Sequence, residues 1–342
     1  MDRQQPRLRR VVAARRRPAG ADQTELLQCQ PAPRRLPRAG RRARTAGAAG
    51  DPVQGARRGP VGQRTRRDPL AARSRHRARR RDPVNVVVLG SGTAVPVPDR
   101  FPAGYLVEHG THRLLIDCGP GILRRLAQAG TSVRDLDAVL LTHYHTDHCA
   151  DVAPLLFALR SPHLSPRPPL TIYGAPGLRR LIERLTEAWP WLAPKGYELR
   201  LVELAPGTFA ADDFEVTAVP IRHTAQSLGY RIHADGTRIA FSGDADTCDE
   251  LVDLARGADL FVCDTASPDG RKLDGHLTPG LAAGYAARAG AGTLVMTHFY
   301  PECEGVDLIA QARARFDGQI VAAEDLMRLG GPGRPGGPSA PS

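Results

Sequence analysis

The pattern of apolar and polar residues predicts strands and helices from residue 84 onward. Short apolar or alternating runs are typical of strands, and they recur at 85–90, 104–109, 112–117, 137–141, 169–173, 198–203, 214–221, 228–233, 237–242, 259–263 and 292–297. Stretches with apolar residues at helical spacing lie at 121–129, 151–160, 176–188, 247–256, 279–289 and 306–316. This mixture predicts one α/β domain over residues 84–329, which is large for one core but within the usual range.

Residues 1–83 differ from this domain in composition. They contain 24 arginines, no lysine and six acidic residues, a formal charge of +18, whereas the whole chain carries +11, so residues 84–342 carry −7. Because the segment has little apolar periodicity, we predict that it is a disordered Arg-rich extension. The glycine- and proline-rich residues 330–342 are predicted to form a disordered tail.

Three interpretations of the Arg-rich extension stay open. A polybasic arm can bind RNA phosphates without sequence preference and with a steep salt dependence. The extension can also be solvated chain without function. We favour a third interpretation, in which residues 1–83 are untranslated and the protein starts near Val84, because the Arg, Pro, Ala and Gly content is typical of an upstream reading frame in a GC-rich gene.

Residues 142–148 carry the strongest chemical signal. They place three imidazoles and one carboxylate within six positions, just beyond an apolar run. In an extended segment, side chains at i and i+2 point the same way, so His143 and His145 can bind one cation together. A turn after them would bring Asp147 and His148 toward a neighbouring position. Imidazole suits zinc and related metals, and carboxylate adds a harder oxygen ligand. The alternative is a histidine-rich surface loop.

Further candidate ligands lie where an apolar run ends or in a glycine-bounded turn, and they are His223, Asp244, His276 and His298. Stiff strands fix such ligands, whereas loops leave a coordination position open. The other five histidines have no such setting, and we interpret His76, His109, His112, His163 and His233 as structural.

This order of residues resembles the metallo-β-lactamase-fold hydrolases. It consists of a His-x-His-x-Asp-His signature at 143–148, a lone histidine, a Ser-Gly-Asp turn and a final Thr-His. The segments 86–93 and 115–119 are similar to the ribonuclease Z and phosphodiesterase branch of that family. The resemblance covers about residues 84–325. It implies a four-layer αββα sandwich with two metals in a cleft at the edges of the sheets.

The resemblance also implies the roles of individual residues. His143, His145 and His223 would hold the first metal. Asp147, His148 and His298 would hold the second metal, and Asp244 would bridge the two. We expect two divalent cations, with Zn²⁺ as the first choice and Mn²⁺ as the alternative.

Two adjacent metals can hold a bridging hydroxide as the nucleophile and can stabilise the charge that develops on a phosphoryl or acyl oxygen. We therefore predict a metal-dependent hydrolase, and in particular a phosphodiesterase. The alternatives are a tRNA 3′-processing endoribonuclease, a thioesterase or lactamase-type hydrolase, and a non-catalytic metal-binding module.

His276 favours the phosphodiesterase. Its Gly-His-Leu-Thr turn resembles a segment of ribonuclease Z in which the histidine faces the scissile phosphate. That resemblance implies that a protonated His276 stabilises the transition state or donates to the leaving oxygen. Asp264 stands where ribonuclease Z usually has a glutamate, and it would either orient His276 or cap the end of a strand. Asp147 would double as a metal ligand and a proton acceptor.

One departure from ribonuclease Z bears on the substrate. Those enzymes commonly carry a protruding arm between the lone histidine and the Ser-Gly-Asp turn, but the 21 residues from His223 to Asp244 suffice only for a hairpin. The negatively charged domain also lacks a broad surface for polyanions, although Arg222, Arg231 and Arg271 could attract one phosphate. We therefore expect a small or short phosphodiester substrate, with RNA as the alternative. The resemblance also implies a homodimer.

The cysteine content and hydropathy predict a cytoplasmic protein without a membrane span. No apolar stretch reaches the roughly 18 residues that a spanning helix requires, and no signal peptide is visible. The six cysteines contain no Cys-x-x-Cys spacing, which suggests reduced thiols.

Overall fold

The computed structural model describes residues 83–165 and 167–330. The predictions for residues 1–82 and 331–342 lie outside this part of the chain. Gly330, the first residue of the predicted tail, is described and is paired with Asn85 at the end of a strand. This strand therefore includes the first residue of the predicted tail.

Two seven-stranded sheets form the centre of the described part. The first has the order β14-β1-β2-β3-β4-β5-β6 and consists of β1 (Val84–Gly90), β2 (Gly104–His109), β3 (His112–Ile116), β4 (Ala138–Leu140), β5 (Leu170–Gly174), β6 (Leu199–Glu203) and β14 (Arg328–Gly330). The second has the order β13-β12-β11-β10-β9-β8-β7 and consists of β7 (Gly207–Ala211), β8 (Phe214–Pro220), β9 (Leu228–Ala234), β10 (Thr237–Phe241), β11 (Leu260–Asp264), β12 (Thr293–Thr297) and β13 (Gln319–Ala322).

Both sheets change from antiparallel to parallel pairing along their width. In the first sheet β1, β2 and β3 are antiparallel and β3 to β6 are parallel. In the second sheet β7 to β10 form an antiparallel meander, and β10 to β13 are parallel. Because parallel strands end at the same edge, residues that follow them in the sequence are brought together there.

Alternate residues of the strands build two kinds of core. In β1, Val86 and Val88 pack between the two sheets, whereas Val87 and Leu89 pack under helices. The core between the sheets includes Phe214 and Tyr230 from the opposite side. Strands buried on both faces appear in the sequence as continuous apolar runs, which is why they were predictable from hydropathy.

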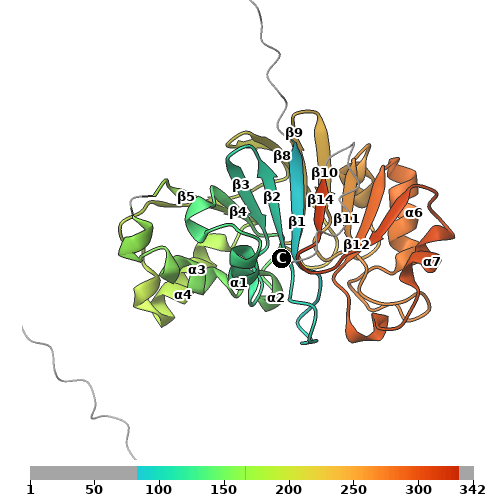
Figure 1. The fold of residues 1–342 in the computed structure, drawn as a ribbon, viewed down its shortest axis with the longest axis horizontal. Coiled ribbons are helices and arrows are strands. Elements are labelled where there is room, and N and C mark those ends of the chain that lie inside the picture. Colours follow the sequence, from blue (N-terminus) through green and yellow to red (C-terminus); the bar gives the residue numbers. More distant parts are fainter. Residues whose placement is uncertain (1–82, 166, 331–342) are drawn as a thin grey trace, which may run out of the picture. The chain divides into compact units, whose positions relative to one another are not determined.

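Helices cover the outer face of each sheet. The first sheet carries α1 (Ile122–Gln128), α3 (Val152–Ala158) and α4 (Leu178–Ala188), and the second carries α5 (Glu250–Ala255), α6 (Pro279–Ala289) and α7 (Leu308–Arg313). A short α2 (Thr146–Cys149) and the 3-10 turns at Val133–Asp135, Pro162–Leu164, Pro190–Leu192 and Pro301–Cys303 complete the described elements. Figure 1 shows α1 to α4 on one side of the sheets and α6 and α7 on the other. The predicted four-layer αββα sandwich is confirmed.

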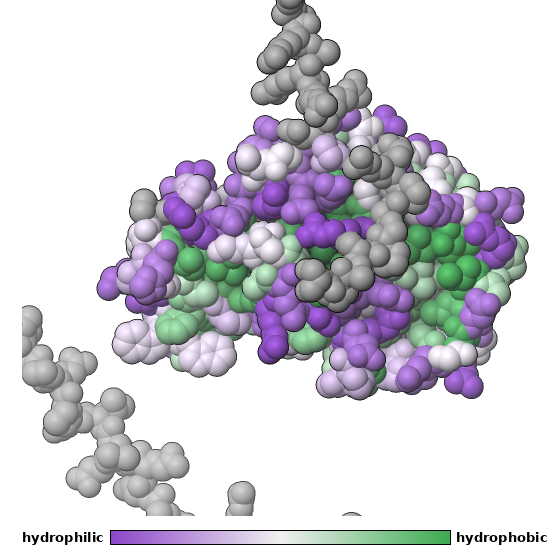
Figure 2. Space-filling view, viewed as in Figure 1, coloured by the Kyte–Doolittle hydropathy of each residue, from purple (hydrophilic) through white to green (hydrophobic). Residues whose placement is uncertain are grey.

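The visible surface of the domain carries both polar and apolar regions (Figure 2). In Figure 2 polar residues line much of the rim, and apolar residues are visible on the side of α1 to α4 and on the side of α6 and α7. None of the helices among the described residues is long and apolar enough to cross a bilayer.

Three strands were not predicted from the sequence, namely β7, β13 and β14. Each lies at the edge of its sheet and pairs with a single neighbour. β7 is largely exposed, and β13 and β14 are only four and three residues long. Edge strands of this kind carry little apolar alternation, so their pairing depends on the tertiary structure.

Candidate metal centre

The candidate ligands lie at the ends of strands from both sheets. In the second sheet Asp244 follows β10, Asp264 ends β11, and His298 follows β12 directly. Because these three strands are parallel, their ends meet at one edge. His276 lies in the loop between β11 and α6.

The first sheet contributes the segment that follows β4. Two hydrogen bonds join this segment to the second sheet: the N–H of Leu228 donates to the Thr142 carbonyl at 2.8 Å, and the Tyr230 hydroxyl donates to the Leu141 carbonyl at 2.8 Å. They hold the residues 143–148 beside the strand ends of the other sheet. The expected turn after His145 is a short helix, α2, which carries Asp147 and His148.

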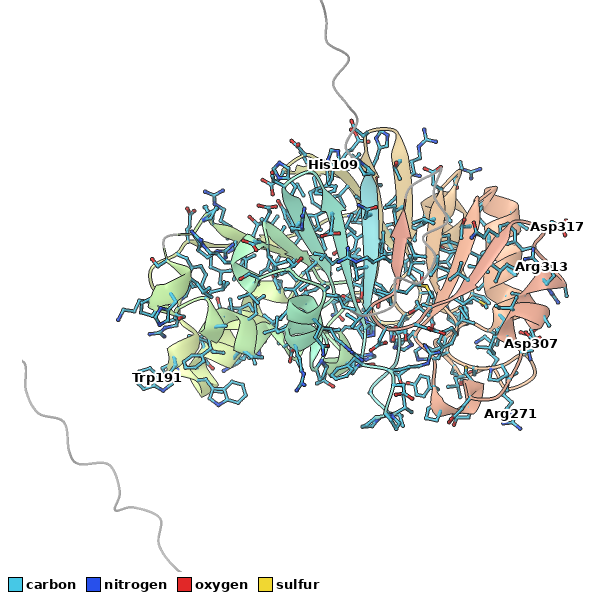
Figure 3. All side chains as sticks on the ribbon, viewed as in Figure 1. His109, Trp191, Arg271, Asp307, Arg313 and Asp317 are labelled. Carbon is cyan, nitrogen blue, oxygen red and sulfur yellow. The ribbon has the colours of Figure 1, made fainter. Side chains whose placement is uncertain are left out.

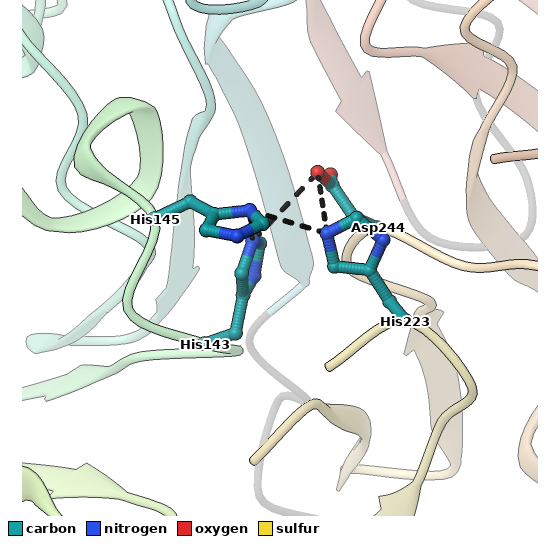
Figure 4. Close-up of side chains that lie close together, drawn as sticks. All are labelled: His143, His145, His223 and Asp244. Carbon is teal, nitrogen blue, oxygen red and sulfur yellow. Dashed lines mark hydrogen bonds and ion pairs between the residues drawn. The ribbon is translucent and has the colours of Figure 1, made fainter. Parts of the chain in front are cut away.

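The first donor set consists of His143, His145, His223 and Asp244. His145 Nδ1 lies 3.0 Å from His143 Nε2 and 3.2 Å from His223 Nε2. Asp244 Oδ2 lies 3.7 Å from His143 Nε2 and 3.6 Å from His223 Nε2 (Figure 4). A tetrahedral zinc with bonds of 2.0–2.1 Å to nitrogen places its ligand atoms about 3.3 Å apart. The spacing of these atoms therefore suits one cation.

The second donor set consists of Asp147, His148 and His298. The Nε2 atoms of the two imidazoles are 3.4 Å apart, and Asp147 Oδ2 lies 3.8 Å from His148 Nε2 and 3.6 Å from His298 Nε2. The spacing again suits one cation. Asp147 and both histidines are buried, in contrast to His145 of the first set, which is exposed.

Asp244 lies between the two sets. Its Oδ2 atom faces His143 and His223, and its Oδ1 atom lies 3.1 Å from His148 Nε2 and 3.2 Å from His298 Nε2. Yet this Oδ1 is buried and has no hydrogen-bond partner among the described residues. A buried carboxylate oxygen without a partner is costly, and a bound cation would remove that cost. The donor chemistry and this orphaned atom both fit a pair of divalent cations.

The pKa values of the imidazoles also indicate that this cluster of side chains suits bound cations. Burial by itself lowers the pKa of His298, but the charge of Asp244 and contacts with Asp147 and Asp264 outweigh it and raise this pKa to about 10. Burial and the neighbouring His148 lower the pKa of His143 to about 2, so its ring is neutral. The carboxylates of the centre therefore attract positive charge, which protons supply in the absence of metal.

Asp117 orients His148 and was not identified as a site residue from the sequence. This buried residue follows β3, and its Oδ2 atom accepts a hydrogen bond from His148 Nδ1 at 2.7 Å. It also accepts from the backbone N–H and the hydroxyl of Thr142, both at 2.8 Å. A carboxylate behind a ligating imidazole fixes the ring and its tautomer. Two signals in the sequence could have identified it: its place at the end of an apolar run and its position within the family-like segment 115–119.

Asp117 and His298 also have positive φ angles, 58° and 63°. Residues other than glycine rarely adopt this backbone conformation. It costs of the order of 1–3 kcal/mol and is found preferentially at functional sites.

His276 lies beside both donor sets. Its ring is 5.1 Å from the ring of His223 and stacks on that of His298 at 5.3 Å. His276 Nδ1 lies 3.1 Å from Asp264 Oδ2, the contact expected from the sequence. His276 also forms a third possible donor set with Asp244 and His298.

Asp264 is buried and accepts hydrogen bonds at one oxygen from three donors. Besides His276 Nδ1, these are the N–H groups of Ala245 at 3.1 Å and Leu277 at 3.3 Å. Burial by itself lowers the pKa of His276, but the hydrogen bond and charge of Asp264 outweigh it and raise the pKa above its ordinary value. A raised pKa favours the protonated ring, which is the form that can donate a proton.

The three arginines expected to attract a phosphate have different environments. Arg231 donates to the Asp253 carbonyl on α5 at 3.1 Å, so its guanidinium packs against that helix. Arg222 is exposed and donates to the Thr247 carbonyl at 3.5 Å. Arg271 points outward at the periphery (Figure 3). The 21 residues from His223 to Asp244 form the β9–β10 hairpin, as expected.

Comparisons with known proteins agree with this geometry. The model of the β-lactamase superfamily domain matches residues 112–299. The chain is 32% identical over 274 residues to ribonuclease Z of Mycobacterium bovis, an alignment that covers 72% of this chain and 98% of that protein.

Among solved structures, the metallo-β-lactamase-fold protein YhfI of Bacillus subtilis has a TM-score of 0.64 and 28% identity, with 73% of this chain and 100% of that chain covered. The short form of human tRNase Z has a TM-score of 0.60 and 26% identity, with 72% and 98% covered. The chain therefore belongs to the β-lactamase superfamily and, within it, to the ribonuclease Z family of metal-dependent hydrolases.

Proposed function

We propose that this hydrolase cleaves a phosphodiester bond in a small or short substrate with the help of two divalent cations. His143, His145 and His223 would hold one cation, and Asp147, His148 and His298 the other. The observation that carries this proposal is Asp244, whose two buried oxygens each face a separate donor set. Three imidazoles and a carboxylate oxygen favour Zn²⁺, with Mn²⁺ as the alternative.

When bound, two such cations supply a nucleophile at neutral pH and stabilise negative charge on phosphoryl oxygens. The protein residues provide the remaining chemistry. Asp264 accepts from His276 Nδ1 and holds the ring at the centre, and the protonated ring can then donate to the leaving oxygen from its other nitrogen.

Asp147 supplies the second proton-handling group. Burial by itself raises the pKa of Asp147, but the neighbouring His298 and His148 rings outweigh it and lower this pKa to about 2. Asp147 is therefore ionised at neutral pH, the form that ligation requires, and it can accept a hydrogen bond from the attacking water. Its low pKa makes it a weak base, so a part in proton transfer requires that the attacking water be activated by the cations.

Processing of tRNA 3′ ends is the second candidate. It is favoured by the relationship to the ribonuclease Z of M. bovis, which spans almost the whole of that protein. Against it stands the short β9–β10 hairpin, which leaves no room between His223 and Asp244 for a substrate-binding arm. A thioesterase or lactamase activity is less well supported, because the His276–Asp264 pair is suited to a phosphodiester leaving group.

The decisive experiment compares substrates on the zinc-loaded protein. Bis-p-nitrophenyl phosphate, a 2′,3′-cyclic nucleotide, a precursor tRNA and nitrocefin would be assayed side by side, with EDTA-treated protein as the control. We expect hydrolysis of the small phosphodiesters, its loss with EDTA, and no turnover of nitrocefin. Faster hydrolysis of nitrocefin than of every phosphodiester would contradict the proposal, and cleavage of precursor tRNA alone would favour the second candidate.

We propose a homodimer, as the family resemblance implies, and a catalytic domain that begins near Val84. Light scattering coupled to gel filtration would test the first point.

A further inference from the structure

Asp246 has a larger set of polar contacts than its place beside the metal ligands requires. Its side chain is mostly buried. Asp246 Oδ1 accepts from the Thr247 N–H at 2.7 Å and pairs with Lys272 Nζ at 2.8 Å. Asp246 Oδ2 accepts from the Gly275 N–H at 3.0 Å, and the Asp246 N–H donates to the Arg222 carbonyl at 2.6 Å. One residue thus joins three segments that each carry a candidate site residue.

The contact with Gly275 continues to a metal ligand. The Gly275 carbonyl accepts from His223 Nδ1 at 2.8 Å. Because the proton of the ring then lies on Nδ1, the other nitrogen, Nε2, has its lone pair free for a cation. This Nε2 lies 3.2 Å from His145 Nδ1, within the first donor set.

The backbone at Gly275 lies unusually close to the His223 ring. The φ angle of Gly275 is +84°, and a Cβ atom there would lie only 3.0 Å from His223 Nδ1. The next residue is His276, so the position of the Gly275 peptide affects both His223 and His276. Asp246 Oδ2 accepts from the Gly275 N–H on one side of the Gly275 Cα, and the Gly275 carbonyl accepts from His223 on the other side; Lys272 in turn holds Asp246 through their ion pair.

We propose that Asp246 is a positioning residue that fixes the Gly275 carbonyl, and through it the tautomer and orientation of His223, in the first metal site. This inference rests on the proposed two-cation function, and it assigns a role to a residue outside the ligand set. Polar partners behind a metal-bound imidazole commonly change metal affinity by 10- to 100-fold when they are removed. Asp246 acts one hydrogen bond further away, so its loss should have an effect at the lower end of that range. Because His223 belongs to the first donor set and not to the second, the loss should weaken the first site selectively.

The test measures zinc binding to the full chain rather than turnover. Apo protein would be titrated with Zn²⁺ against a chromophoric chelator, for the wild type, Asp246→Ala, Asp246→Asn and Lys272→Met. We expect Asp246→Ala to weaken one of two affinities by about 10-fold and to leave the other within about threefold. Asp246→Asn should have a smaller effect, because its amide oxygen can still accept from the Gly275 N–H, and Lys272→Met should also have a smaller effect.

The matched control is Asp253→Asn. Asp253 is an exposed aspartate that pairs with Arg256, and among the described residues its side chain has no polar contact with a candidate ligand. This variant should bind both cations like the wild type. Circular dichroism would check that each variant is folded. If Asp246→Ala does not fold, Asp246→Asn still provides the test.

A second readout reports on His223 itself. In protein labelled with ¹⁵N-histidine, the Nδ1–H resonance of His223 can be assigned by its loss in His223→Gln. We expect Asp246→Ala to shift or broaden this resonance, and Asp253→Asn to leave it unchanged.

Two results would overturn the inference: wild-type affinity for both cations in Asp246→Ala, or an unchanged His223 resonance in that variant. If the wild type binds no zinc, the proposed function fails. The resonance in metal-free protein then still decides whether Asp246 positions His223.

Discussion

At the scale of single residues, the hydrogen bonds around His276 are compatible with two roles, a proton donor and a metal ligand. Its Nδ1 is bound to Asp264, so only its other nitrogen is free for the substrate or for a cation. The donor set that it can form with Asp244 and His298 makes the second role a real alternative. The two roles have different consequences for metal content.

We predict that His276→Ala lowers phosphodiester turnover by roughly 100-fold or more while the protein keeps two metal ions per chain, because a general acid is lost but the seven ligands remain. Turnover of bis-p-nitrophenyl phosphate and elemental analysis would be measured on the same sample. Loss of one metal equivalent would identify His276 as a ligand, and unchanged turnover would exclude it from the chemistry.

At the scale of elements, the position of α2 depends on a close approach between two loops. Cys118 N–H donates to the His148 carbonyl at 2.7 Å, and a Cβ on the following residue, Gly119, would lie 2.1 Å from the Asp147 carbonyl oxygen. That overlap is with backbone, which cannot rotate away. Any side chain at Gly119 must therefore displace α2, which carries two ligands of the second donor set.

We predict that Gly119→Ala abolishes binding of one cation and destabilises the fold, whereas Gly284→Ala does neither. Gly284 lies within α6, and a Cβ there meets no atom within 4 Å, so alanine should stabilise the helix by about 0.5–1 kcal/mol. Zinc stoichiometry and thermal unfolding of both variants would check this pair. Two bound cations in Gly119→Ala would show that α2 can move without loss of its ligands.

The elements were predictable to different degrees. The central strands β1, β4, β11 and β12 are buried on both faces, and their apolar runs identify them without any neighbour. The edge strands β7, β13 and β14 were not predicted, because a strand with one partner needs no such pattern.

At the scale of the whole molecule, cations should link the two halves of the sandwich. The first donor set combines residues that follow β4, in one sheet, with residues that follow β8 and β10, in the other. A ligand that binds only the folded state stabilises it by RT ln(1 + [L]/Kd), which is about 4 kcal/mol at a concentration a thousandfold above Kd.

We therefore predict that EDTA lowers the Tm of the wild type by about 10 °C, given about 2–4 °C per kcal/mol for a domain of this size. The control is His143→Ala, which lacks a central ligand and should show a smaller response to EDTA. An equal Tm with and without EDTA in the wild type would mean that no cation binds tightly to the folded protein.

The Arg-rich extension lies outside the described residues, but its charge has a consequence at this scale. We predict that a chain of residues 84–342 retains the turnover of small phosphodiesters by the full chain and loses any strongly salt-dependent binding of RNA, because the removed segment carries +18 and the remainder −7. Kinetics and RNA binding at several salt concentrations would compare the two chains. Turnover that falls severalfold in the shorter chain would assign residues 1–83 a part in catalysis.

The sequence by itself determined most of the strands and helices and most of the candidate ligands, and the family resemblance implied the four layers. Strand and helix periods are local, and His143 and His145 lie so close along the chain that their spacing alone predicts a shared cation. The contact between Asp264 and His276 was expected from the family resemblance, whereas the tertiary structure alone revealed the other carboxylates that support the site. Asp117 meets His148 across 31 residues and Asp246 meets Gly275 across 29, and no local pattern encodes such contacts. They form only because parallel strands from two sheets end at one edge, so that buried polar groups must find their hydrogen-bond partners there.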